Sequence, residues 1–164
     1  MRIGLLSDLH GRFDPLLPKV LGGVERILLA GDTVDERLLE ALRRIAPLEA
    51  VRGNNDCGPS FSALPEFRDL ELEGCRILIA HDRHDRRLAA EVERVRPNVL
   101  VVGHSHKPMV AREQGLLVVN PGSAGPKRFH LPRTAGWMEI LPRRAPSVAL
   151  WDLERDRRYS LKGR

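Results

Sequence analysis

The fold prediction rests on the stretch Ile3-Gly4-Leu5-Leu6-Ser7-Asp8-Leu9-His10-Gly11. Its first four residues form an apolar run without alternation, which is typical of a strand buried on both faces. Residues 27–30 and 48–51 form similar strand-like runs further along the chain. Because helical patterns lie between these runs, we expect strand–helix–strand units and a sheet that is covered by helices.

Local signals predict the remaining elements. Asp14 and Pro15 suit the N-cap and first residue of a helix that runs to about Val20. Helical periods are expected over residues 35–45 and about 85–95, and a β-hairpin over residues 67–80. Further strands are expected at residues 99–102, 116–119, 137–141 and 148–153. This order predicts one α/β domain over residues 1–164, a four-layer α/β/β/α sandwich of two mixed sheets flanked by helices.

Composition and charge narrow the function classes. The 164 residues suit one domain, and 27 Lys and Arg against 22 Asp and Glu give a formal net charge of +5. The densest basic patch is the tail, about residues 154–164, where a solvated terminus is expected rather than a phosphate-contacting surface. Cys75, Trp137 and Trp151 lie in predicted strands and are expected in the core.

The two cysteines form no CxxC pair, which favours a reducing compartment. The sequence shows neither a leader peptide nor an apolar run of the roughly 20 residues that a membrane helix needs. We therefore expect a cytoplasmic protein without a membrane partner.

Metal-capable side chains follow the carboxyl ends of the predicted strands. One such motif alone would suit an N-cap or a turn, but its repetition at the same position after several strands favours a metal site. In open α/β sheets these strand ends meet in one crevice, so the motifs should converge. The candidates are Asp8, His10, Asp32, Asp35, Asn54, Asn55, Asp56, His81, His104 and His106.

The types of ligand select the metal. Carboxylates, imidazoles and one amide, without thiolate, suit divalent ions such as Mn²⁺, which we expect first, and also Fe²⁺, Zn²⁺, Co²⁺ or Ni²⁺. Seven donors, namely four imidazoles, two carboxylates and one amide out of these ten candidates, are too many for one tetrahedral zinc and suit two ions that share a bridging carboxylate. Such a pair clamps the attacking and leaving oxygens of an in-line displacement, which indicates phosphoester hydrolysis.

The ordered motifs resemble those of the calcineurin-like metallophosphoesterases. The matching motifs are Asp8-x-His10, Gly31-Asp32-x-x-Asp35, Gly53-Asn54-x-Asp56, His81 and Gly103-His104-x-His106. The chain length and the segment Asn120-Pro121-Gly122-Ser123 resemble the small single-domain branch of bacterial and archaeal phosphodiesterases. A eukaryotic retromer subunit of the same fold is also similar.

The resemblance implies a role for each matching residue. Asp8, His10 and His106 would hold one ion, Asn54, His81 and His104 the other, and Asp32 would bridge them. Asp35 and Asp56 would orient the ligands through hydrogen bonds, although Asp35 also suits the N-cap of the following helix. A metal-bridging hydroxide would attack the phosphorus of a small phosphodiester while the two ions neutralise the developing charge.

Two positions depart from the family pattern. Asn55 stands where many relatives have a His that protonates the leaving group. Asn can donate a hydrogen bond to phosphate but no proton, so we expect slow turnover of alkyl esters. Asp82 stands where a Gly usually follows the metal-binding His81, and His84 is an alternative ligand to His81. Arg83 either contacts the substrate phosphate or is solvated.

The alternative function is a non-catalytic scaffold of the same fold that binds protein partners. The complete donor set speaks against it, because clustered charges are costly without a ligand. Nucleic acid is not expected as a partner, because aromatic residues make up only 4% of the chain and offer no stacking platform. A cyclic nucleotide, another diester and a small monoester stay open as substrates, and so does a homo-oligomeric state.

Overall fold

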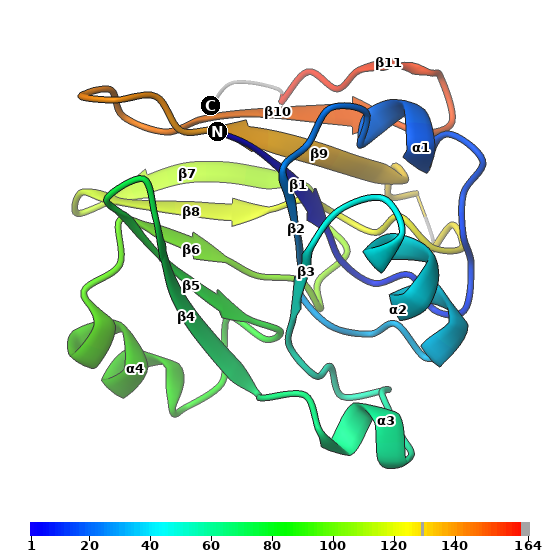
Figure 1. Cartoon of the computed structure of the whole chain (residues 1–164), viewed down its shortest axis with the longest axis horizontal. Coiled ribbons are helices and arrows are strands. Elements are labelled where there is room, and N and C mark those ends of the chain that lie inside the picture. The colour runs from blue at the N-terminus through cyan, green and yellow to red at the C-terminus, as the bar shows by residue number, and fades with distance from the viewer. Residues whose placement is uncertain (129, 162–164) are drawn as a thin grey trace.

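Two mixed β-sheets pack face to face in the computed structural model, which describes residues 1–128 and 130–161 (Figure 1). The first sheet has six strands in the spatial order β11-β10-β9-β1-β2-β3, and the second has five in the order β4-β5-β6-β8-β7. The first consists of β1 (Arg2–Leu6), β2 (Arg26–Leu29), β3 (Leu48–Ala50), β9 (Thr134–Glu139), β10 (Ser147–Asp152) and β11 (Arg157–Arg158). The second consists of β4 (Phe67–Leu72), β5 (Cys75–Ala80), β6 (Val99–Val101), β7 (Met109–Glu113) and β8 (Leu116–Asn120).

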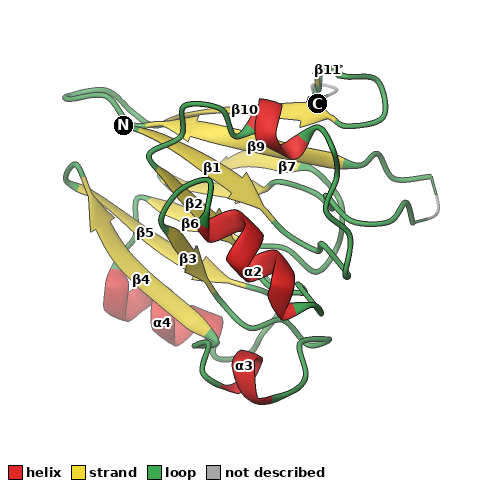
Figure 2. Ribbon diagram, turned by 45° about the vertical axis from the view of Figure 1, so that its right-hand side comes forward, coloured by secondary structure: helices red, strands yellow, loops and turns green. Residues whose placement is uncertain are grey.

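Helices cover the outer faces of both sheets (Figure 2). Residues of α1 (Leu17–Val20), α2 (Glu36–Arg43) and α3 (Pro59–Ser62) join the core on the outer face of the first sheet. On the second sheet, α4 (Leu88–Val95) packs against the outer face.

Neighbouring residues of β1 show how the layers form, because successive side chains of a strand point to opposite faces. Leu5 is buried between the two sheets with Ile79, whereas Leu6 is buried on the helix side with Leu42. A third apolar cluster, which includes Leu78, joins the second sheet to α4. The predicted four-layer sandwich is therefore confirmed.

Parallel pairing brings the strand ends to shared edges. β1, β2 and β3 are parallel to one another, and so are β5, β6 and β8. The antiparallel strands β9, β4 and β7 extend these parallel cores and make both sheets mixed. The loops after the parallel strands of both sheets are those that carry the predicted ligands.

Several sequence-based boundaries were wrong. The first helix begins at Leu17 rather than beside Pro15, because the Asp14 side chain accepts a hydrogen bond from the Leu16 N–H and leaves a turn ahead of the helix. The elements α3, β7 and β11 were not predicted from the sequence. Trp137 and Trp151 are half-buried rather than in the core, with Arg2 and Lys19 over their rings, whereas Cys75 is buried as predicted.

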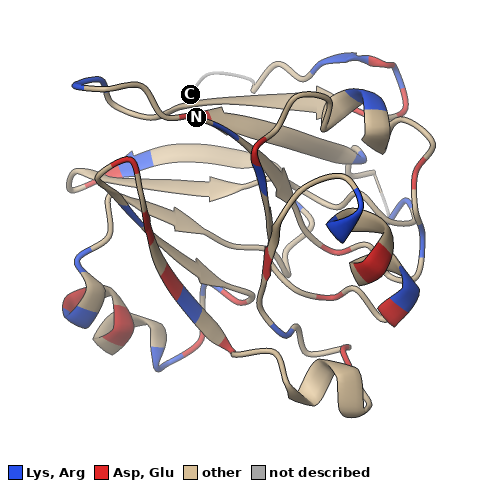
Figure 3. Cartoon of the chain, in the orientation of Figure 1, with Lys and Arg blue, Asp and Glu red and all other residues tan. Residues whose placement is uncertain are grey.

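The start of the basic tail is exposed, as a solvated terminus would be, but it is also ordered. Arg157–Arg158 form β11, which pairs with the end of β10, and Asp156 binds Lys19 at 2.7 Å. Lys162 and Arg164 lie outside the described residues. Figure 3 shows basic and acidic residues next to one another on α2, on α4 and around β11, so the positive net charge is spread over the surface. Among the described residues, no helix is both long and apolar enough to cross a membrane.

Candidate metal centre

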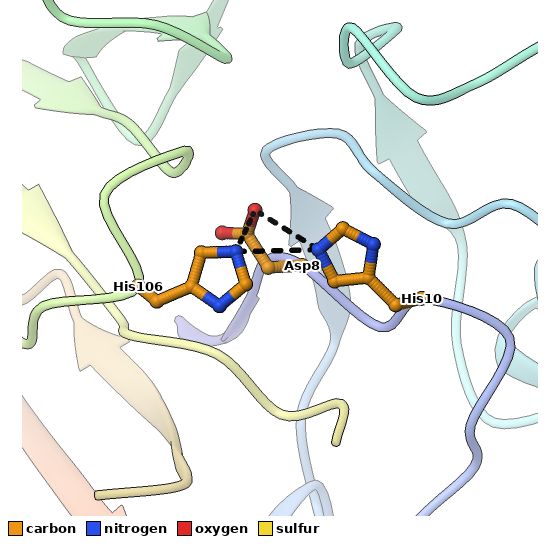
Figure 4. Close-up of side chains that lie close together, drawn as sticks. All are labelled: Asp8, His10 and His106. Atoms are coloured by element: carbon orange, nitrogen blue, oxygen red, sulfur yellow. Dashed lines mark hydrogen bonds and ion pairs between the residues drawn. The ribbon is translucent and has the colours of Figure 1, made fainter. Parts of the chain in front are cut away.

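The loops after β1 and β6 bring together three of the predicted ligands, Asp8, His10 and His106. The Nε2 atoms of the two imidazoles are 3.2 Å apart, and Asp8 Oδ1 lies 3.3 Å from His106 Nε2 and 3.9 Å from His10 Nε2. Figure 4 shows the carboxylate and both rings directed toward one another from separate segments of the chain. Their ligand atoms all lie within 4.8 Å of one another, so they could hold one ion.

A second group lies beside the first and comes from the loops after β2, β3, β5 and β6. Asn54 Oδ1 is 2.9 Å from His81 Nε2 and 2.9 Å from His104 Nδ1. Asp8, Asp32 and His81 also offer ligand atoms within 4.8 Å of one another. The structure thus brings all seven predicted ligands into two adjoining groups.

Asp32 lies between the two groups. Its Oδ2 atom is 3.7 Å from His10 Nε2 on one side and 3.4 Å from His81 Nε2 on the other. The side chain is 2% exposed, so this oxygen faces the imidazoles rather than solvent. This is the position that a bridging carboxylate requires.

The backbone of the ligand loops is strained. Five of the predicted ligands have left-handed backbone conformations, with φ of 55° at Asp8, 44° at His10, 55° at Asp32, 64° at His104 and 56° at His106. Each such conformation costs a non-glycine residue about 1–2 kcal/mol. Strain of this kind clusters at functional sites, where the surrounding structure holds it in place.

Two glycines permit the close approach of the loops. A Cβ atom at Gly53 would lie 2.1 Å from Asp32 Oδ1, and one at Gly103 would lie 1.9 Å from Ser7 Oγ and 2.9 Å from Asp8 Oδ2. No other residue type fits at these two positions without moving a predicted ligand. The glycines that precede Asn54 and His104 are therefore packing requirements of the site.

Unpartnered atoms at the centre fit a cation. Asp8 is fully buried and accepts hydrogen bonds at Oδ2 from Ser7 Oγ (2.6 Å) and from the His104 N–H (3.1 Å), but Oδ1 has no hydrogen-bond partner among the described residues. A buried carboxylate oxygen without a partner is costly unless it is paired or binds a metal. Its position among imidazole nitrogens, without thiolate, suits a divalent ion.

The two central carboxylates, Asp8 and Asp32, have pKa values shifted in opposite directions. Burial raises the pKa of Asp8 to about 6, against the hydrogen bond from Ser7. Burial also opposes ionisation of Asp32, but hydrogen bonds from His81 and Asn55 outweigh it and hold the pKa of Asp32 well below its usual range. Asp32 is therefore the permanent anion of the site, which suits a carboxylate shared by two cations.

The histidines of the first group are neutral near pH 7 and so can donate a lone pair. Burial, together with His10 and Arg128, lowers the pKa of His106 to about 4, and burial also lowers the pKa of His10. In His81, the Asp32 carboxylate and the Ala30 carbonyl outweigh burial and raise the pKa. The His81 Nδ1 atom lies 2.7 Å from that carbonyl, which fixes the ring and leaves Nε2 for the site.

Asp56 orients a ligand, as the family resemblance implied. Its Oδ2 accepts hydrogen bonds from the Asp32 N–H (2.9 Å) and the Gly53 N–H (2.8 Å), and its Oδ1 accepts one from the Val34 N–H (2.7 Å). The side chain is buried, and it ties the loop after β2 to the loop after β3. Its role is positioning.

Asp35 does not reach the ligands, so the expected orienting role is corrected. Its carboxylate caps α2 through the Arg37 N–H and also binds the Arg37 guanidinium at 2.7 Å.

Asn55 does reach the site: its N–H donates to Asp32 Oδ1 (2.8 Å), and its Nδ2 donates to Asp32 Oδ2 (2.7 Å).

Among the described residues, no side chain of residues 82–84 forms a hydrogen bond with a predicted ligand. His84 is exposed, and its N–H donates to Asp82 Oδ1 at 2.8 Å, so His81 rather than His84 belongs to the site. Arg83 binds Glu113 at 2.9 Å, and both side chains line a cavity that His104 also borders.

Supporting residues of the loops were not assigned roles from the sequence. Asn120 Nδ2 donates to the Gly103 carbonyl (2.8 Å) and to Ser105 Oγ (3.0 Å), which braces the turn that carries His104. Ser123 Oγ donates to the Asp8 carbonyl at 2.9 Å. The only sequence signal for them was the segment Asn120-Pro121-Gly122-Ser123, which carried part of the family resemblance.

Comparisons with known proteins agree with this architecture. The model of the calcineurin-like phosphoesterase superfamily domain matches residues 1–142. A probable metallophosphoesterase of Methanocaldococcus jannaschii is 33% identical over 137 residues, which cover 75% of this chain and 68% of that protein. A phosphodiesterase of the same organism is 25% identical over 139 residues, or 74% of this chain and 83% of that protein. Vacuolar protein sorting 29 from Cryptosporidium parvum has the same fold, with a TM-score of 0.81 at 21% identity, over 96% of this chain and 94% of the other.

A two-sheet sandwich with paired carboxylate and imidazole groups at one edge defines the metallophosphoesterase class of proteins. The chain belongs to the calcineurin-like phosphoesterase superfamily.

Proposed function

We propose that the protein is a dinuclear metal-dependent phosphodiesterase that hydrolyses small phosphodiesters. Asp8, His10 and His106 would hold one divalent ion, and Asn54, His81 and His104 the other, with Asp32 shared. Two ions held in this way supply a water-derived nucleophile near neutral pH and neutralise the charge that develops on the phosphoryl oxygens. Mn²⁺ is the ion we expect first, because nitrogen and oxygen donors without thiolate suit it.

One observation carries the proposal. A single buried oxygen, Asp32 Oδ2, lies between an imidazole of each group, at 3.7 Å from His10 Nε2 and 3.4 Å from His81 Nε2. A mononuclear site has no need of an anion in that position. The low pKa of Asp32 keeps the shared carboxylate charged, as two neighbouring cations require.

Asn55 limits the range of leaving groups. Its amide donates to Asp32 Oδ2 and so positions the shared carboxylate, but it has no proton to give to a departing alkoxide. General acid catalysis is typically worth about 10²–10⁴-fold, so activated aryl diesters should be cleaved much faster than alkyl monoesters. Equal rates on the two kinds of ester would contradict this role for Asn55.

The decisive experiment uses metal-stripped protein reloaded separately with Mn²⁺, Fe²⁺, Zn²⁺, Co²⁺ or Ni²⁺. Bound metal is counted by mass spectrometry, and hydrolysis is measured on matched aryl monoesters and diesters. We expect about two ions per chain and a preference for diesters. In Asp32→Asn, activity should fall on the order of a thousandfold, as when one strong electrostatic contact to a transition state is removed, and both ions should bind more weakly.

Asp35→Asn is the matched control, because it makes the same chemical change three residues away in a carboxylate that binds Arg37 and caps the helix terminus. It should keep its metal and its activity. Full activity in D32N would contradict the bridging role. Two bound ions without hydrolysis of any ester would favour the alternative, a non-catalytic scaffold that binds protein partners.

We also propose that the protein acts in a reducing cellular compartment. The cysteines are both free, with Cys57 exposed, which suits a reducing compartment such as the cytoplasm.

A further inference from the structure

Two cavities meet beside the second ligand group. The larger has a volume of about 800 Å³ and the smaller about 210 Å³. His104 and Asp82 line both cavities, whereas Asn54 and His81 line only the smaller one. A phosphoryl group bound at the ligands would therefore lie where the two cavities join, with one ester group directed into each.

The walls of the larger cavity are largely apolar along the edge strand β7. Pro108, Met109, Val110 and Ala111 follow one another along its wall, and Val102 contributes from the end of β6. A volume of this size holds an organic group with several rings, and binding sites for such groups are mostly apolar with a few fixed polar contacts. A simple phosphate or a methyl ester would leave most of this space unfilled.

One side of the larger cavity suits a flat ring. The Arg83 guanidinium is fixed by two hydrogen bonds to Glu113, at 2.9 and 3.0 Å, and its Nη1 lies 3.6 Å from Met109 Sδ. A guanidinium held in one orientation can stack on an aromatic ring, and a thioether makes favourable contacts at a ring edge. Because Glu113 neutralises Arg83, this part of the wall favours an uncharged ring, whereas Lys107 and His84 give another part of the lining a polar character.

We propose that the larger cavity binds an aromatic, nucleoside-sized ester group of the substrate. This inference rests on the proposed function, and it restricts the substrate to unsymmetrical phosphodiesters with one bulky aromatic substituent and one smaller substituent. Ala111 is a specificity-determining position, because its small side chain leaves room for the ring.

The test compares two diesters with the same leaving group, thymidine 5′-(4-nitrophenyl) phosphate and methyl 4-nitrophenyl phosphate, on the metal-loaded full-length protein. The wild type should cleave the thymidine ester with a kcat/KM at least about tenfold higher, the discrimination expected when an apolar pocket is filled. Ala111→Trp should remove about tenfold from the thymidine ester, mainly through KM, and change the methyl ester by less than about twofold.

Arg112→Trp is the matched control, because Arg112 neighbours Ala111 on β7 but lines a different cavity. It should leave both substrates unchanged, and Ala111→Leu replaces A111W if the larger side chain lowers the folded fraction. Equal losses on both esters in A111W, with R112W unchanged, would overturn the inference, as would no loss on either.

Binding of thymidine 5′-monophosphate, measured by titration calorimetry, separates this inference from the proposed function. If neither ester is cleaved but A111W weakens binding about tenfold, the phosphodiesterase assignment fails and the aromatic cavity stands. If both esters are cleaved without discrimination and A111W leaves binding unchanged, the cavity inference fails and the phosphodiesterase stands.

Discussion

Asp8 and Asp14 are both buried, at 0% and 4% exposure, yet their surroundings differ completely. Asp14 forms an ion pair with Arg133, and its other oxygen accepts a hydrogen bond from the Leu16 N–H at 2.9 Å. Arg133 also donates to the carbonyl groups of Gly125 (2.6 Å) and Ala124 (3.2 Å). Asp8 faces imidazoles and another carboxylate, and one of its oxygens is unpartnered.

The difference distinguishes a carboxylate that stabilises the fold through an ion pair, Asp14, from one that is suited to bind a cation, Asp8. Burial of a charge is tolerated when a partner and hydrogen bonds surround it, as at Asp14. At Asp8, hydrogen bonds compensate Oδ2 but none reaches Oδ1 among the described residues, and the strained backbone adds to the cost. Sites that bind cations are expected to be destabilising when they are empty, because their donors repel one another.

Removal of the arginine partner should have the largest effect on stability. Arg133→Met leaves the buried Asp14 with the half-exposed Arg12, at 3.8 Å, as its remaining cation among the described residues. The free energy of unfolding should therefore fall by about 3 kcal/mol in urea denaturation. The double variant D14N/R133M should recover part of that loss, because it removes the stranded charge. Equal stability of R133M and the wild type would show that Asp14 is not held by this pair.

Asp8→Asn should act in the opposite direction on metal-stripped protein. Asn keeps an oxygen for Ser7 and His104, and its amide can donate toward His106 in place of the unpartnered oxygen. Burial raises the pKa of Asp8 from 3.8 to about 6, so its charge destabilises the folded state near pH 7. Removal of this charge should raise the free energy of unfolding by about 1–3 kcal/mol.

The same variant should lose the metal-induced rise in melting temperature that the wild type shows, because Asp8 belongs to the donor set. Asp35→Asn serves as the control and should keep that rise. A metal-free D8N protein less stable than the wild type would contradict the contrast with Asp14.

Asp152 offers a smaller, pH-dependent test of the same contrast. It is 2% exposed, and although burial opposes it, Arg155 and the N–H groups of Arg155 and Glu154 hold the pKa of Asp152 below its usual value. A carboxylate with a lowered pKa stabilises the folded state above its unfolded pKa of 3.8, and this contribution is lost as the pH falls through the folded value.

Asp152→Asn should therefore cost about 1 kcal/mol at pH 7 and less at pH 3, measured as unfolding free energy against pH. A variant with the same deficit at both pH values would show that the contribution of Asp152 is not electrostatic.

Much of the site was predictable because its residues are tied to strand ends. Parallel strands of one sheet deliver their following loops to one edge, so Asp8, Asp32 and Asn54 could be expected together from their positions alone. The N-cap role of Asp35 was also predictable. The sequence did not show that this role directs the carboxylate toward the helix terminus and not toward the ligands.

Pairs of residues that lie far apart in the chain could not be predicted from the sequence. Nothing local links Asp14 to Arg133, which lie 119 residues apart, and the short strand β7 gave no signal although it forms the wall of the larger cavity. The side chains of Trp137 and Trp151 have the apolar character of core residues, but each is only partly buried against the helix-side core and has a cationic side chain, Arg2 or Lys19, over its ring.

The donors are divided between the two sheets, since Asp8, His10, Asp32 and Asn54 follow strands of the first and His81, His104 and His106 follow strands of the second. Bound ions would therefore fasten one layer of the sandwich to the other at a single rim. Binding of the ions should slow amide hydrogen exchange in both sheets at once. The ions would then stabilise the packing of the two sheets as well as take part in hydrolysis.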